Sequence, residues 1–441
     1  MEAAVYVTFC ILAIISLAFQ FLAMKTKSQV SSGNNPHFKK FQYLFFTVYF
    51  MALFSDWLQG PYVYKLYSYY GYASSQIALL YVAGFASSVI FGTATGPLAD
   101  RFGRKKMALC FCLLYSFCCL TKLSSNFFWL FLGRIFGGIS TSMLFSTFES
   151  WYVYEHTETY DFPNDWISVT FSKATFGNGV LAINAGVISN IFAETLGFGP
   201  VAPFMLAIPF LLIAGVIILK TWTENYGNQD VDLSRSCLEG LRTIIFKESI
   251  FYLGVIQALF EANMYIFVFQ WTPILDSEHT PLGMVFACFM ICIMIGSSIY
   301  SILLSKKYKS EQLLLLSVYL AIISTSICIF TTSDYPVMSF VAFLLLEVSV
   351  GIYFPCISFL RSQVIPEKLR ASIMNWFRVP MNIITCGGLL LLHNKTLISS
   401  NQSMFGICTV VLVLALFSNV KFNKLYQHDT EGNQPLLTTQ Q

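Results

Sequence analysis

Seven charged side chains lie inside stretches that are otherwise apolar and long enough to cross a bilayer. A charge inside a membrane costs free energy, so such residues usually face the interior of a helix bundle or a water-filled cavity. The seven are Asp56, Arg134, Glu149, Lys173, Glu261, Glu347 and Arg378. The three cations suit an anion, because Arg offers a planar fork for two oxygens and Lys a point charge.

Four of these charges occupy repeated positions in the chain. Counted from residues 41 and 248, Asp56 and Glu261 have nearly the same offset, and so do Lys173 and Arg378. This repetition is typical of membrane proteins built from two related halves. We therefore expect Lys173 and Arg378 to face each other across a central cavity, roughly 10 Å from the inner ends of their helices.

The carboxylates have two interpretations. Asp56 is expected to pair with Arg134 nearer the outer ends, while Glu149 lies closest to the inner cations. Glu261 mirrors Asp56, and Glu347 either couples protons or balances Arg378. Alternatively, all seven charges form structural ion pairs that hold one conformation.

The composition excludes a water-soluble globular protein. Hydrophobic residues make up 56% of the 441 residues and charged residues 11%. Hydropathy predicts an all-α membrane protein with thirteen spans, namely 4–24, 41–60, 74–97, 107–122, 127–148, 167–193, 200–220, 248–271, 282–304, 312–331, 337–360, 371–393 and 403–421. The expected domains are an extra N-terminal helix with its connector (1–40), two six-helix halves (41–220 and 248–422), a cytoplasmic central loop (221–247) and a disordered tail (423–441).

Basic residues orient this bundle. Most of the 26 Lys and Arg residues fall in segments that this topology places in the cytoplasm. The first span has no basic residue before it and no clear cleavage site, which favours an uncleaved anchor over a signal peptide. The N-terminus is then outside and the C-terminus cytoplasmic. Residues 149–166, an expected cytoplasmic loop, are acidic, but acidic residues weigh little in this rule.

The residue patterns typical of metal binding and of ATP-driven chemistry are absent from the sequence. The five histidines lie in or next to loops, and the cysteines show no C-x-x-C spacing, so we expect no metal site and no cofactor. No phosphate-binding G-x-x-x-x-G-K-[ST] loop is present, which argues against ATP-driven chemistry. We expect neither an enzyme nor a nucleic-acid partner. Tyrosines 62, 64, 67, 69 and 70 and Trp57 crowd the outer end of span 41–60, either as interface anchors or as stacking surfaces for a substrate.

Residues 96–106, GPLADRFGRKK, form a short charged turn between two spans. The turn resembles the G-x-L-A-D-R-x-G-R-K loop between the second and third helices of the major facilitator superfamily. Gly96 is expected to let neighbouring helices approach closely, and the loop would gate the cytoplasmic side through Gly96, Asp100, Arg101, Gly103, Arg104 and Lys105.

Further strings narrow the resemblance. They are DWLQGPY (56–62), FESWY (148–152), DFP (161–163), GPVAPF (199–204), IQALFE (256–261), WTP (271–273) and NWFRVP (375–380). Together they resemble the molybdate-anion transporter branch of that superfamily over residues 41–422. The resemblance implies secondary transport of molybdate into the cell across the cell membrane, with no cofactor.

The residues alone indicate only an anion at the level of Lys173 and Arg378, with Arg134 as a further ligand. They do not separate molybdate from sulfate, since both are tetrahedral dianions. A porter for another small anion or a neutral solute and a non-transporting scaffold or sensor remain alternatives. Two sequons, at Asn394 and Asn401, predict glycosylation of the outer 393–403 loop, with Asn394 favoured because it is farther from the next span.

Overall fold

The computed structural model describes residues 1–26, 35–227, 233–276, 280–331, 335–366, 369–393 and 401–432, and the regular elements in these ranges are helices. The longer helices are α1 (Glu2–Thr26), α2 (Pro36–Gln59), α4 (Ser74–Phe102), α5 (Arg104–Thr121), α6 (Phe127–Leu144), α8 (Asp165–Asn190), α9 (Ala202–Thr221), α11 (Glu248–Leu275), α12 (Leu282–Ser305), α13 (Ser310–Thr331), α14 (Pro336–Val364), α15 (Arg370–His393) and α16 (Asn401–Gly432). Shorter ones are η1 (Gly60–Tyr62), α3 (Val63–Tyr69), α7 (Thr147–Tyr154), η2 (Glu155–Thr159), η3 (Ile191–Thr195) and α10 (Leu233–Phe246).

Each predicted span coincides with one of the long helices to within a few residues at most ends. Among the described residues, ten helices are long and apolar enough to cross a membrane, and α1 is one of them. Three other predicted spans, α2, α5 and α15, are not among these ten helices, because polar and charged residues lower their hydropathy. The chain is therefore a multi-pass helical membrane protein.

Local sequence sets where several helices begin. The Asn35 side chain accepts a hydrogen bond from the backbone N–H of His37 at 2.9 Å, and Pro36 occupies the first turn of α2. Asn126 accepts a bond from the N–H of Phe128 in the same way at the start of α6. Such caps satisfy backbone donors that the first turn of a helix leaves free.

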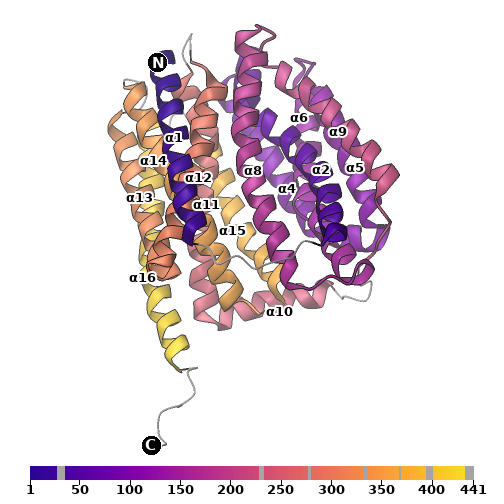
Figure 1. Cartoon of the computed structure of the whole chain (residues 1–441). Coiled ribbons are helices and arrows are strands. Elements are labelled where there is room, and N and C mark those ends of the chain that lie inside the picture. Colours follow the sequence, from indigo (N-terminus) through magenta and orange to yellow (C-terminus); the bar gives the residue numbers. More distant parts are fainter. Residues whose placement is uncertain are drawn as a thin grey trace, which may run out of the picture.

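The helices form two groups that lie side by side (Figure 1). Helices α2 to α9 pack mainly among themselves, as do α11 to α16. The groups meet where α4 packs on α15 and α8 on α12, and α1 packs along α12. Helix α10 lies across one end of the bundle (Figure 1). We call that end the inner end and the opposite one the outer end, following the predicted orientation.

Glycines allow the closest approach between the groups. A β-carbon at Gly186 of α8 would lie 2.7 Å from the Gly283 carbonyl oxygen of α12, and one at Gly283 would lie 2.4 Å from the Gly186 carbonyl oxygen. Both distances are shorter than van der Waals contact, so any side chain at either position would separate the helices. Both residues lie in the outer half of their helices.

Three predicted connections contain more helix than expected. Residues 149–166 are not simply a loop, because α7 and η2 continue the chain in helical form as far as Thr159. The predicted central loop contains the amphipathic helix α10. Helix α16 extends to Gly432, well past the predicted end of the last span. Residues 433–441 of the predicted tail lie outside the described residues.

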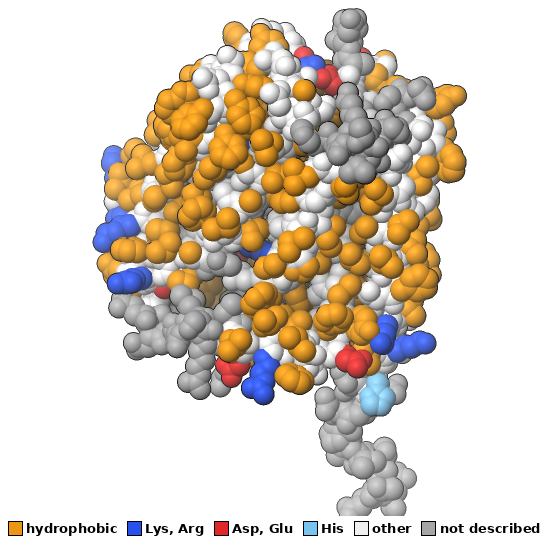
Figure 2. All heavy atoms as spheres, turned by 180° about the vertical axis from the view of Figure 1, so that it is seen from behind, with side chains coloured by type: hydrophobic (Ala, Val, Ile, Leu, Met, Phe, Trp, Pro, Cys, Tyr) orange, Lys and Arg blue, Asp and Glu red, His pale blue; other side chains and the backbone are white. Residues whose placement is uncertain are grey.

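Apolar side chains cover most of the described surface on the face in Figure 2, with Lys and Arg at its edge and lower end. Exposed apolar residues include Ile14, Leu17, Ile90 and Leu113, all from the middle parts of long helices. In water such a surface would be unfavourable, whereas hydrocarbon chains of a bilayer solvate it.

Candidate anion-binding site

Lys173 lies on α8, about 12 Å from its inner end. Its Nζ donates a hydrogen bond to Oε1 of Gln42 on α2 at 3.1 Å. Gln42 in turn donates to the Thr170 hydroxyl at 2.7 Å. The partner of the ammonium group is thus an uncharged amide, and the Lys173 side chain is exposed rather than sealed in the core. The positive charge remains available to an anion.

Arg378 lies at the same depth on α15, about 12 Å from its inner end. Its side chain is exposed and extends to the opposite group of helices. Nη1 of Arg378 lies 4.0 Å from the position that a β-carbon would occupy at Gly92, and Ser142 Oγ lies 3.2 Å from the same point. Arg378 thus reaches α4 from α15, near the point where Ser142 of α6 packs on α4. No hydrogen bond joins Arg378 to any group that also contacts Lys173 within the described ranges, so the expected pairing of the two cations around one anion stays a prediction.

Arg361, which we did not predict as a site residue, contributes a third cation. It lies in the last turn of α14, and its Nη1 donates to Oε1 of Gln257 on α11 at 3.3 Å. Hydropathy ends this span at residue 360, which placed Arg361 just outside the membrane. An arginine at a helix end has a side chain long enough to reach back into the bundle. The sequence could have indicated Arg361 in this way.

Glu261 of α11 lies near two arginines of the α11 to α16 group, Arg361 and Arg378. Its carboxylate experiences the attraction of Arg361 and, more weakly, of Arg378. The Tyr353 hydroxyl donates to Glu261 Oε1 at 3.2 Å. Glu261 is thus a carboxylate shared by two cations, and its predicted part in the site stays a prediction.

A tyrosine also faces Glu149, in the other group. Glu149 lies in the first turn of α7, opposite the Tyr49 hydroxyl of α2. Tyr49–Glu149 links α2 to α7, and Glu261–Tyr353 links α11 to α14. The two halves therefore use the same pair of residue types with the carboxylate and the hydroxyl exchanged between helices.

Asp56 and Arg134 do not form the expected ion pair in this conformation. Asp56 accepts a hydrogen bond from the Tyr115 hydroxyl of α5. Arg134 donates from Nε to the Leu80 carbonyl oxygen at 3.2 Å and lies over the Tyr81 ring, 4.9 Å from its centroid. Tyr115 lies on α5, and the order of the spans does not reveal that this helix supplies the partner of Asp56.

Two further charges are buried. Glu347 is 5% exposed on α14, close to Cys292 of α12, and forms no ion pair with any described residue. Lys122, in the turn after α5, is only 2% exposed and donates to the Tyr67 hydroxyl at 2.9 Å. Tyr62, Tyr64 and Tyr67 are likewise buried, so packing and not interface anchoring explains these three aromatics.

The charged turn after α4 is held by hydrogen bonds. Nε and Nη2 of Arg104 both donate to Asp100 Oδ1, at 3.0 and 2.7 Å. The Lys105 N–H donates to Glu224 Oε1 at 2.8 Å, so a residue from after α9 caps α5. Gly103 has a φ of +104°, which favours glycine.

Gly96 and Arg101, the other two residues predicted in this turn, do not take part in these hydrogen bonds. A β-carbon at Gly96 would meet nothing within 4 Å, so the expectation that Gly96 permits close helix contact is wrong. Arg101 lies beside the Phe102 ring, 5.9 Å from its centroid.

An ion pair joins the two groups at the outer end. Lys65 Nζ of α3 lies 2.7 Å from Asp276 Oδ1 and 2.8 Å from Oδ2, just after α11. Leu389 of α15 and Phe269 of α11 pack there with Tyr64 and Tyr81 from the other group. Together with Gly186 and Gly283, these contacts close the outer side of the bundle.

Comparison with known proteins identifies the family. Residues 5–348 match the family described as "sugar transporters, 12 TM". A molybdate-anion transporter from Xenopus tropicalis is 44% identical, with 98% of this chain and 97% of the relative covered. One from Takifugu rubripes is 42% identical, with 92% of each chain covered. The chain belongs to the molybdate-anion transporter family of the major facilitator superfamily. The solved structure of a peptide transporter in complex with alafosfalin shares the fold, with a TM-score of 0.70, 15% identity, and coverage of 92% of this chain and 99% of that chain.

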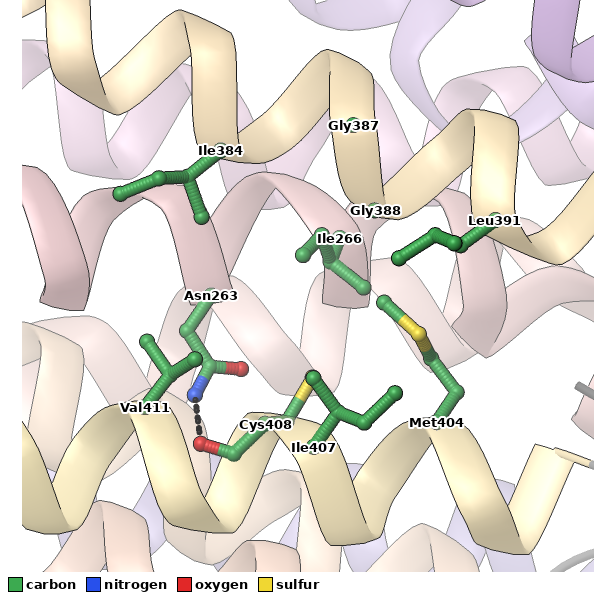
Figure 3. Close-up of a pocket in the computed structure, with 10 residues that line it drawn as sticks. All are labelled: Asn263, Ile266, Ile384, Gly387, Gly388, Leu391, Met404, Ile407, Cys408 and Val411. Atoms are coloured by element: carbon green, nitrogen blue, oxygen red, sulfur yellow. Dashed lines mark hydrogen bonds between the residues drawn. The ribbon is translucent and has the colours of Figure 1, made fainter. Parts of the chain in front are cut away.

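One well-formed cavity of this family member, about 250 Å³ in volume, is not an anion site. It lies between α11, α15 and α16 (Figure 3). Its lining is almost wholly apolar, and the Nδ2 group of its one amide, Asn263, already donates to the Cys408 carbonyl oxygen at 3.0 Å. A dianion would lose its hydration there without compensation. The charged residues described above lie elsewhere.

The structure does not test the predicted glycosylation sites. Asn394 lies outside the described residues. Asn401 is the first residue of α16. Both sequons remain predictions.

Proposed function

We propose that this chain carries molybdate into the cell by alternating access, with Lys173 and Arg378 as principal ligands and Arg134 as a further candidate. The observation that carries the proposal is that Lys173 and Arg378 form no ion pair with any described residue, although both lie well inside long helices of the bundle. Cations without an ion-pair partner inside a bundle are costly unless an anion binds them. The relatives' names supply the identity of the anion.

The transport cycle follows from where the two groups touch. The contacts between α3 and α11 and between α8 and α12 lie toward the outer end. These contacts support an outward-closed conformation, and we place the anion site on their cytoplasmic side. Rocking of one half against the other would break the Lys65–Asp276 pair and open the site to the outside. The proposed location is the cell membrane, with the N-terminus outside, and no chemical change of the anion is involved.

Uptake of radiolabelled molybdate tests the proposal. Cells producing the chain should accumulate molybdate with saturable kinetics, and a variant carrying both Lys173→Gln and Arg378→Gln at equal surface expression should not. Competition by excess sulfate measures how far the site separates two dianions of the same shape. Equal uptake by cells with and without the chain would refute molybdate transport.

A further inference from the structure

Arg361 has a position and a set of partners unlike those of the other arginines. It lies near the inner end of α14, nearer the cytoplasm than Lys173 and Arg378. Nη1 donates to Gln257 at 3.3 Å and Nη2 to the Ser358 hydroxyl at 3.5 Å. Both acceptors are uncharged, and both bonds are long for a guanidinium. Arg361 is therefore lightly held and free to change partners.

Gln257 connects Arg361 to the candidate anion site. The Gln257 carbonyl accepts from Arg361, while its side chain also bonds the Glu261 carboxylate. Glu261 in turn lies in the field of Arg378. Two arginines thus share one carboxylate, and the excess positive charge extends from Arg378 toward the cytoplasmic opening. Gln257 is buried, so this connection does not depend on a mobile surface residue.

We propose that Arg361 is a second anion-contacting residue, which receives the oxyanion from Arg378 on the cytoplasmic side of the central site. This inference rests on the proposed function. A dianion that leaves Arg378 directly for water must break its charge-assisted hydrogen bonds before new ones form. A guanidinium with weak neutral partners offers replacement bonds on the way. Permeating ions need sites that bind strongly enough to admit them and weakly enough to release them.

Such a residue should affect one face of the membrane only. When the site is open to the outside, it would contain Lys173 and Arg378 but not Arg361, because Arg361 lies near the cytoplasmic end of α14. Removing the Arg361 charge should therefore raise the half-saturation concentration for molybdate at the cytoplasmic face by about tenfold, while the value at the outer face changes by less than about twofold. Arg361→Lys keeps the charge but loses the fork, so its value should lie between those of the wild type and Arg361→Gln.

The experiment measures molybdate flux from each side, in intact cells and in inside-out vesicles, for the full chain and its variants. Arg370→Gln is the matched control, because Arg370 is an exposed arginine at the inner end of the neighbouring α15. Its values should stay within about twofold of the wild type at both faces, since it is remote from Gln257 and Glu261. Thermal midpoints of the purified variants show whether each one folds.

Three results would overturn the inference. The first is an unchanged cytoplasmic half-saturation value in a folded Arg361→Gln protein. The second is an equal rise at both faces, which would indicate a structural role. The third result applies if Arg361→Gln does not fold. An Arg361→Lys protein with an unchanged half-saturation concentration at the cytoplasmic face would then overturn the inference. A wild-type chain without molybdate flux at either face would instead refute the proposed function.

Discussion

At the scale of single residues, the candidate site is defined by which partners its charges lack. Lys173 and Arg361 are held by Gln42 and Gln257, which orient a cation without neutralising it. A carboxylate in either position would have cancelled the charge that an anion needs. The arrangement favours electrostatic recognition of an oxyanion over a purely structural use of these charges.

Substitutions of the two central cations should change apparent affinity. Arg378→Gln or Lys173→Gln removes a charge-assisted hydrogen bond worth about 1.5–3 kcal/mol, so the half-saturation concentration for uptake should rise about tenfold or more. Arg378→Lys should be poorly tolerated because an ammonium group cannot bind two oxygens as a fork, whereas Lys173→Arg should keep partial activity. Uptake kinetics at matched surface expression measure this. Near-normal values in both Gln variants would move the site to Arg134 or to uncharged donors.

The partner of Asp56 can be tested by double substitution. Asp56 accepts a bond from Tyr115, so Asp56→Asn and Tyr115→Phe should be non-additive in transport rate by about 1 kcal/mol or more. The cycle of Asp56→Asn with Arg134→Gln asks whether the predicted ion pair forms in another state of the transport cycle. Strictly additive effects in that second cycle would remove the Asp56–Arg134 pair.

At the scale of elements, short connections hold the long helices in place. The segment after α9 crosses the turn between α4 and α5, where Glu224 caps α5 and the Trp222 ring stacks on Trp151 of α7 at 3.7 Å. This segment ties the inner ends of α4, α5, α7 and α9 into one unit, which suits a half that moves as a rigid body.

Gly103→Ala should loosen this connection. The residue has a φ of +104°, and a β-carbon there would lie 2.5 Å from the Glu224 carboxylate. We expect a loss of about 1–3 kcal/mol of stability, visible as a lower thermal midpoint of the purified protein. Gly96→Ala in the same turn is the control, because its β-carbon would meet open space. Equal midpoints for the two variants would contradict the structure of the turn.

The Lys65–Asp276 pair should bias the cycle toward the outward-closed state. The two side chains are 33% and 18% exposed, so the pair is worth at most about 1 kcal/mol. Lys65→Asp should increase opening at the outer end, measured as faster labelling of a cysteine introduced at Trp57. Combining it with Asp276→Lys should restore wild-type labelling. Failure of the double variant to do so would show that this pair does not hold the gate.

At the scale of the whole molecule, the predicted orientation makes two claims about the termini and loops. With the N-terminus outside, an epitope tag at residue 1 should be accessible on intact cells. The 393–403 loop should also be outside and carry sugar on Asn394 more than on Asn401, which begins α16. Glycosidase digestion of Asn394→Gln and Asn401→Gln variants measures the second claim. A tag that antibodies reach only after permeabilisation would refute the thirteen-span topology.

The sequence by itself predicted the helices and their order, and it indicated the charges from which the proposed site is built. Helix positions follow from local hydrophobicity and length, which are properties of short segments, and the predicted spans match the observed helices closely. The turn at 96–106 and the strings around Arg378 indicated the family that the comparisons identify. Lys173, Glu261 and Arg378 were noticed because they are charged residues inside apolar runs. A charge in the membrane costs free energy, so such residues usually have a function.

Only the tertiary structure decided which side chains meet. Asp56 binds Tyr115 and not Arg134, Lys122 is buried although it lies in the turn after α5, and Arg361 reaches into the bundle from beyond its predicted span. Each partner lies on a different helix, and hydropathy contains no information on helix rotation or on how far a long side chain extends. Packing of small residues such as Gly186 and Gly283 sets those rotations, and a single sequence does not reveal which helices they bring together.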